Sequence, residues 1–157
     1  MTTTALRTHR AATDNDGDVM SARFNIARRN GAPPRPEDAC QPGAMRRIAA
    51  HRLRAFGLQA MTDDVMLIVS ELVTNAVLHS AGSLVSLELT IEAGHLRISV
   101  RGDTPAHPLV QNPAPDAEAG RGLQIVEALA TAHHGQWGTS DQGATTWCLL
   151  SLAGVRR

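Results

Sequence analysis

The sequence predicts an α+β fold, a two-layer sandwich with helices on one face of a mainly antiparallel, mixed sheet. Two observations lead to this prediction. Apolar residues recur at helical spacing through residues 44–57 and 62–79. The period then changes to alternation through residues 83–102, with a turn at EAGH, which is typical of a β-hairpin.

Composition is consistent with one ordinary domain. The chain has 157 residues, of which 43% are hydrophobic, enough for a proper core. We expect the domain over residues 21–157, after a polar, disordered leader at residues 1–20. The formal net charge is zero and the pI is about 7.1, which argues against a nucleic acid or an anionic membrane held by bulk electrostatics. All 15 basic residues are arginine, so no lysine is available for catalysis.

Cysteine usage and hydropathy indicate the compartment. Cys40 and Cys148 are the only cysteines and form no CxxC pair, which excludes zinc-binding and redox motifs of that type. The leader has no apolar segment of a signal peptide, and no apolar run approaches about 18 residues. We therefore expect a cytoplasmic protein with reduced thiols and no membrane partner.

The first half of the domain should be mainly helical. A short strand is expected at ARFNIAR, residues 22–28, where apolar and polar residues alternate. Residues 29–43 contain four prolines and two glycines and are expected to form a loop. The helix at 44–57 has one apolar face. The helix at 62–79 begins at TDD, which suits an N-cap, and is apolar nearly all round, so we expect it to be central.

The second half follows the hairpin. Residues 103–122 hold four prolines and two glycines in one long loop. Such loops inside compact domains are usually lids or binding loops. A helix at 123–133 and a buried strand at 144–152 complete the chain.

Three polar side chains lie on the central helix at intervals of four residues. Glu71, Asn75 and His79 therefore form one stripe, and burying them costs free energy unless they are satisfied. One reading is a core network satisfied by the protein itself. The other is a cofactor with a metal: Glu71 could orient or deprotonate a nucleophile, and Asn75 could give a carboxamide oxygen to Mg²⁺.

The segment GRGLQIVEALA closes the long loop and opens the next helix. Gly120 and Gly122 let the backbone approach an anion, and the helix opening at Leu123 presents free N–H groups and its positive dipole end. Arg121 could reach a phosphate or remain solvated. An ordinary turn before a helix would explain the two glycines equally well.

Two further candidates lie at strand ends. Asp103, in RGDTPAHP, could accept a hydrogen bond from an exocyclic amine such as that of adenine, or could form an ordinary turn with Thr104 and Pro105. Thr145 and Thr146 open the last strand, and either hydroxyl could touch a base, although threonines are common in strands.

In order and spacing these motifs resemble those of the GHKL ATPase and kinase superfamily, whose histidine kinase-like (Bergerat) fold also serves gyrase, heat-shock chaperones and sensor histidine kinases. ELVTNAVLH resembles its N box, VRGDTP its first glycine box, GRGL its second and GATTW its last. DDVMLIVSELVTNAVLHS followed by GRGLQIVEALA is similar to the branch of anti-sigma-factor serine/threonine kinases. The resemblance covers about residues 40–152, and four motifs in order are far more specific than one.

The resemblance implies ATP and Mg²⁺ as cofactors. Glu71 matches the catalytic carboxylate and Asn75 the Mg²⁺-binding asparagine, while residues 104–119 match the mobile ATP lid. The other residues that we assign to the ATP site on this basis are His79, Asp103, Gly120, Arg121, Gly122, Leu123 and Thr145.

One motif departs from the family pattern. The family places its adenine-reading aspartate two residues after the last valine of the strand, whereas here Gly102 holds that position and Asp103 follows one residue later. A shift of one residue in an extended chain turns a side chain to the opposite face. Asp103 would therefore reach adenine only if Gly102 allowed the backbone to bend.

The resemblance implies an ATP-binding regulatory protein in the cytoplasm. It would be an anti-sigma factor that phosphorylates a serine or threonine of an anti-sigma antagonist and separately sequesters a sigma factor. Members of this branch are often homodimers. The alternative is a non-catalytic protein-binding module of the same fold with weakened or lost nucleotide binding. The shifted Asp103 favours the alternative, and the retained Glu71 and Asn75 oppose it.

Overall fold

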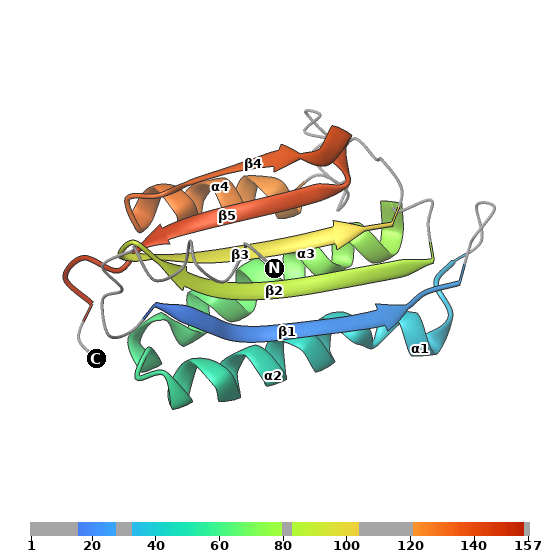
Figure 1. Ribbon diagram of the computed structural model, residues 1–157. Coiled ribbons are helices and arrows are strands. Elements are labelled where there is room, and N and C mark those ends of the chain that lie inside the picture. Colours follow the sequence, from blue (N-terminus) through green and yellow to red (C-terminus); the bar gives the residue numbers. More distant parts are fainter. Residues whose placement is uncertain (1–15, 28–32, 80–82, 104–120, 156–157) are drawn as a thin grey trace, which may run out of the picture.

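The computed structural model describes residues 16–27, 33–79, 83–103 and 121–155, which form an α+β sandwich of two layers (Figure 1). A five-stranded sheet is one layer, and the helices pack against one of its faces. The predicted fold class is confirmed.

The strands are β1 (Gly17–Asn25), β2 (Leu84–Glu92), β3 (His95–Gly102), β4 (Gln136–Ser140) and β5 (Thr145–Ser151). They lie in the order β1-β2-β3-β5-β4, and each neighbouring pair is antiparallel, so the described sheet contains no parallel pair. Ala93 and Gly94, both at positive φ, form the two-residue turn between β2 and β3. Such a tight turn permits only antiparallel pairing.

The helices are α1 (Pro36–Ala39), α2 (Gln41–Ala55), α3 (Thr62–His79) and α4 (Arg121–Ala132), with 3-10 turns at η1 (Gln59–Met61) and η2 (Asp141–Gly143). Helix α3 packs against α2, α4 and the sheet strands β2 and β3, so it is the central helix, as predicted. Its bounds also match the prediction.

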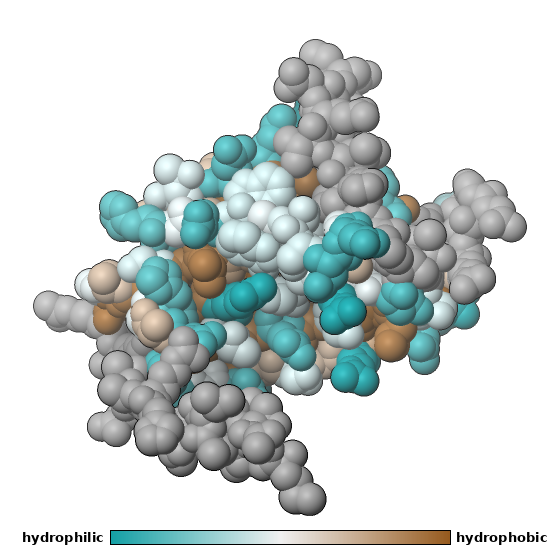
Figure 2. Space-filling model, turned by 45° about the horizontal axis from the view of Figure 1, so that its top comes forward, coloured by the Kyte–Doolittle hydropathy of each residue, from teal (hydrophilic) through white to brown (hydrophobic). Residues whose placement is uncertain are grey.

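Alternation divides the sheet into a helix-covered face and an open face. The buried residues of the hairpin that face the helices are Val85, Leu87, Leu89, Ile91, Leu96, Ile98 and Val100. The polar residues between them, such as Ser86, Glu88 and Arg97, line a groove of about 670 Å³ on the open face. Figure 2, an oblique view of the molecule, shows mostly hydrophilic and neutral residues where the surface is coloured.

The first strand begins earlier than expected. Strand β1 starts at Gly17 rather than near residue 22, so the domain includes residues that we had placed in the leader. Gly17 pairs with Ile91 and Met20 with Leu89 across a bulge, and Val19 is fully buried. The sequence did not indicate this pairing, because Gly17 and Asp18 at the start of the strand have low strand propensity. Residues 1–15, the rest of the expected leader, lie outside the described residues.

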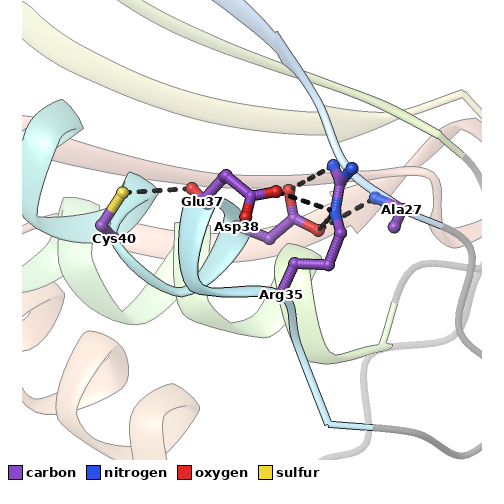
Figure 3. Close-up of polar contacts among 5 residues, drawn as sticks. All are labelled: Ala27, Arg35, Glu37, Asp38 and Cys40. Atoms are coloured by element: carbon purple, nitrogen blue, oxygen red, sulfur yellow. Dashed lines mark hydrogen bonds and ion pairs between the residues drawn. The ribbon is translucent and has the colours of Figure 1, made fainter.

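The expected loop at residues 29–43 contains helical segments instead. Pro36 and Pro42 occupy the first turns of α1 and α2, where a missing N–H is not needed by the helix. The carboxylate of Asp38, only 1% exposed, accepts hydrogen bonds from the Ala27 N–H at 3.0 Å and from Nε and Nη2 of Arg35, both at 3.0 Å (Figure 3). These bonds fix the crossing from β1 to the helical layer.

Candidate functional site

The polar stripe of α3 lines a cleft between α3 and α4. Glu71 and Asn75 are half-buried, and His79 is the exposed last residue of the helix. The three side chains share one helix face because they are spaced by four residues. The cleft has a volume of about 360 Å³, within the range of small-molecule sites. Its lining residues are Glu71, Thr74, Asn75, Leu78, His79, Arg121, Gly122 and Ile125.

Helix α4 begins at the cleft. Arg121, its first residue, is exposed, and Gly122 is buried against α3. A β-carbon placed on Gly122 would lie 2.5 Å from Oε2 and 3.4 Å from Cδ of Glu71, so the bare Cα lies directly beneath the carboxylate. Leu123 is 1% exposed and its side chain belongs to the core, which leaves only its backbone available to the cleft.

A second contact fixes α4 relative to α3 at the far end of both helices. Nε2 of His133, just after α4, lies 2.6 Å from Oδ2 of Asp64 in the first turn of α3. Leu123 and Val126 anchor the intervening turns of α4 in the core. Helix α4 is therefore held against the antiparallel helix α3 at both of its own ends, with Gly122 opposite Glu71.

The Glu71 carboxyl is a perturbed acid. Burial raises the pKa of Glu71 above its ordinary value of 4.5, because desolvation disfavours the charged form. The carboxyl lines the cleft, and carboxyls with a perturbed pKa in clefts are candidate acid–base groups.

The cleft fits an anion at its α4 end. The first N–H groups of a helix have no acceptor within the helix, and they carry its positive dipole. In α4 these N–H groups belong to residues that include Arg121 and Gly122, both of which line the cleft. A glycine at the second position lets an anion approach the backbone closely.

The donor set also fits Mg²⁺ bound together with phosphate. Within the described residues no group of three His, Cys, Asp or Glu side chains could hold a metal ion alone. Mg²⁺ is usually held by one or two protein oxygens plus substrate phosphates and water. The amide oxygen of Asn75 lines the same cleft as the N-terminus of α4 and would supply one such oxygen.

Asp103 does not lie in this cleft. Its carboxylate accepts hydrogen bonds from the Ser83 N–H, at 2.9 Å and 3.2 Å to its two oxygens, and from the Ser83 hydroxyl at 3.2 Å. Desolvation raises the pKa of Asp103, but the hydrogen bonds from the backbone N–H groups of Leu84 and Ser83 and from the Ser83 hydroxyl together outweigh it, so the pKa is lowered from its ordinary value. Asp103 lines the groove on the open face with Arg101. Its hydrogen bonds to Ser83 join the residue after β3 to the residue before β2.

The bend that would bring Asp103 to adenine is absent. Gly102 is the last residue of β3, pairs with Val85, and donates its N–H to the Ala144 carbonyl at 2.9 Å. It is not among the glycines with positive φ. A side chain at position 102 would therefore continue the alternation and point to the helix side, while Asp103, one residue later, lines the open-face groove together with the backbone of Gly102.

The two threonines of β5 are also separated by alternation. Thr145 pairs with Arg101, lines the open-face groove and donates its hydroxyl to Oδ2 of Asp141 at 2.7 Å. Thr146 pairs with Val100, a buried helix-side residue. Residues paired across antiparallel strands share a face. Thr146 is therefore the threonine on the helix side, whereas Thr145, which we expected beside a bound base, lies in the open-face groove.

Sequence reasoning also missed three lining residues. Thr74 and Leu78 follow Glu71 at three and seven residues on α3, and Ile125 follows Gly122 at three residues on α4. Their helical spacing was the available signal. Gly120 and the expected lid at 104–119 lie outside the described residues.

Comparison with known proteins agrees with these features. A family profile described as the histidine kinase-like ATPase domain matches residues 33–148. No curated protein matches the chain at a significant level. Among the described helices, none has the length and apolar character needed to cross a membrane.

Proposed function

This chain belongs to the family of histidine kinase-like ATPase domains, within the GHKL superfamily, and from that premise we propose that it is an ATP-dependent protein serine/threonine kinase of the anti-sigma type. Its substrate would be a serine or threonine of a small antagonist protein. The same chain would separately sequester a sigma factor, acting in the cytoplasm as a homodimer.

One observation carries the proposal. Glu71 and Asn75 on α3 and the N-terminus of α4 at Gly122 line a single cleft. A carboxylate, a carboxamide and a helix N-terminus, which suit a proton acceptor, a Mg²⁺ ligand and an anion site, thus come from segments about 50 residues apart in the sequence. A structural network of polar residues would need none of the open volume beside them.

The proposed reaction is a phosphoryl transfer. The hydroxyl oxygen of the antagonist attacks the γ-phosphorus of ATP, the bond from that phosphorus to the β–γ bridging oxygen breaks, and ADP leaves with the bonding electrons. The hydroxyl proton passes to a carboxylate oxygen of Glu71. Because burial raises the pKa of Glu71, its carboxylate is a stronger proton acceptor than an exposed glutamate.

The remaining cleft residues bind and orient. The N-terminus of α4 would hold the phosphates, with Arg121 beside them, and Asn75 would ligate Mg²⁺. When bound, Mg²⁺ neutralises charge on the phosphates and fixes their orientation. His79, an exposed lining residue of the cleft, would contact the nucleotide.

A second candidate function is a non-catalytic binding module. The contact of Asp103 with Ser83 favours it, because the carboxylate that the family uses to read adenine is already occupied on the opposite face. Such a module would bind its protein partners without turning over ATP.

One experiment distinguishes the two candidate functions. The purified chain is titrated by calorimetry with ATP, with and without Mg²⁺, and is then incubated with γ-labelled ATP and purified antagonist-type proteins of the same organism. The kinase proposal expects ATP binding that Mg²⁺ tightens and label on an antagonist serine or threonine. ATP binding without transfer to any antagonist, or no ATP binding, supports the module instead.

A further inference from the structure

Gly122 is a glycine at a position where the backbone conformation does not call for one. Glycines with positive φ in the described residues are Gly57, Gly94, Gly143 and Gly154. Gly122 is not among them and is the second residue of a regular helix. In such a position alanine is normally preferred to glycine. Backbone conformation therefore does not account for this glycine.

The space that a side chain on Gly122 would need is occupied by Glu71. A β-carbon on Gly122 would meet Oε2 of Glu71 at 2.5 Å, its Cδ at 3.4 Å and its Cβ at 3.5 Å. All three nearest atoms belong to one side chain, and no backbone atom is among them. The carboxylate therefore rests on the bare Cα of Gly122.

We propose that Gly122 is a positioning residue for Glu71: the missing side chain forms the floor that holds the carboxylate at the α4 end of the cleft. This role is distinct from close approach of the backbone to phosphate. It rests on the proposed function only in that Glu71 is taken as the proton acceptor.

A methyl group at this position should displace the carboxylate rather than the helix. Helix α4 is anchored by Leu123 and Val126 in the core and by the contact of His133 with Asp64. The Glu71 carboxylate, by contrast, is the end of a flexible side chain next to open volume. Gly122→Ala should therefore fold, gain helix propensity, and hold its carboxylate in a different place.

The burial of Glu71 supports the same geometry. Desolvation is the cause that raises the pKa of Glu71, and α4 contributes to that burial by direct contact. A carboxylate pushed outward into the cleft would regain water and titrate closer to 4.5, the ordinary value.

The test compares Gly122→Ala with Gly43→Ala. Gly43 is also in the first turn of a helix, and a β-carbon there would meet only the ends of two arginine side chains, Arg47 at 3.3 Å and Arg46 at 3.8 Å. For each variant we would measure thermal unfolding, ATP affinity, phosphoryl transfer against pH, and the Glu71 titration by carboxyl NMR without nucleotide.

We expect Gly122→Ala to melt at or above the parent temperature and to lower phosphoryl transfer by about a hundredfold, as a displacement of about 1 Å can do. Its pH profile and its Glu71 titration should both move to lower pH, while Gly43→Ala should match the parent. In a Glu71→Gln background the same Gly122→Ala change should have no further effect on transfer.

Three results would overturn the inference. The first is a Glu71 titration unchanged by Gly122→Ala. The second is a further loss of transfer when Gly122→Ala is added to Glu71→Gln. The third is a loss of ATP binding in Gly122→Ala with the Glu71 titration unmoved, which would assign the glycine to phosphate. If the parent transfers no phosphoryl group at all, the kinase proposal fails, and the NMR titration still decides the role of Gly122.

Discussion

At one end of the proposed site, the cleft between α3 and α4, the predicted residues Glu71, Asn75 and Gly122 lie together, whereas at the other end, beside β3 and β5, the predicted residues Asp103 and Thr145 line the groove on the opposite face of the sheet. The first end would hold phosphate and metal, and the second the base. The difference reflects the two periods. A helix keeps residues four apart on one face, but a strand changes face at every residue.

The residues proposed for phosphate and metal are therefore in place, whereas those expected to recognise the base are not. The groups proposed for the phosphate end would act on any nucleoside triphosphate. In the described part of the base end, the helix-side positions hold Gly102 and Thr146, neither of which distinguishes an amino group from a carbonyl. Purine selectivity is therefore expected to be weak while phosphate binding is retained.

The largest expected effect is the loss of phosphoryl transfer when Glu71 is changed. Glu71→Gln keeps the shape of the side chain but cannot accept the proton, so phosphoryl transfer should fall by about 10²–10⁴-fold with ATP affinity retained. Single-turnover transfer of labelled phosphate measures this. Unchanged transfer would remove Glu71 from the mechanism.

Metal dependence is the next largest effect. Asn75→Ala should remove the tightening of ATP binding by Mg²⁺, a loss of at least about tenfold, since even outer partners of metal ligands contribute about 10–100-fold. Gln124→Ala is the matched control, because it removes an exposed carboxamide outside the cleft. Calorimetry with and without Mg²⁺ measures both. An equal response of the two variants would contradict the role of Asn75.

The base end can be sharpened by restoring the family order. The parent should bind ATP and GTP within about threefold, and Asp103→Asn should change ATP affinity little. Gly102→Asp places a carboxylate on the helix side and should favour ATP over GTP by about tenfold, or about 1.4 kcal/mol. Competition of both nucleotides against a fluorescent ATP analogue measures the ratio. A parent that strongly prefers ATP, and loses the preference in Asp103→Asn, would refute the placement of Asp103.

The two threonines provide a smaller and paired effect. Thr146→Val should weaken ATP binding by about two- to tenfold, the range of one net hydrogen bond of about 0.5–1.5 kcal/mol. Thr145→Val should leave binding unchanged but lose the 2.7 Å bond to Asp141, lowering the melting temperature by about 2–4 °C. The reverse pattern would return Thr145 to the nucleotide site.

The smallest expected effect concerns stability and pH. The folded pKa of Glu71 is raised, so its contribution to stability is present at low pH and is lost as pH rises through that pKa. At pH 7 the ionised carboxyl therefore costs stability, and Glu71→Gln should melt about 1–2 °C higher than the parent. The difference should vanish below pH 4.5, the ordinary value for the carboxyl. A variant that melts lower at pH 7 would indicate a stabilising charge instead.

Much of the phosphate end could be predicted because it depends on helical spacing. Apolar residues at intervals of three and four defined α3 within its observed bounds, and the polar stripe followed directly. The contact of Gly122 with Glu71 could not be predicted, because it joins two helices whose relative position is set by tertiary packing, including the pairing of His133 with Asp64.

The errors in the fold have local causes. Proline-rich sequence around Pro36 and Pro42 indicated a loop, yet proline is compatible with the first turn of a helix, and both prolines lie there. Strand β1 was placed too late because Gly17 and Asp18 have low strand propensity, and pairing with β2 outweighs it. Thr145 was preferred to Thr146 on the family pattern, although alternation with the apolar Cys148 and Leu150 favoured Thr146.

The sheet order has a consequence for how the chain is made. In the sheet of the described residues, strand β1 lies at one edge and pairs with β2, and α1, α2 and α3 all come between them in the sequence. At about 5–20 residues per second, the ribosome needs several seconds to deliver β2 after β1 has emerged. During this interval the apolar side of β1 waits for its partner, so a nascent chain stalled before residue 84 should expose an unpaired strand to chaperones, and release of β2 should end that exposure.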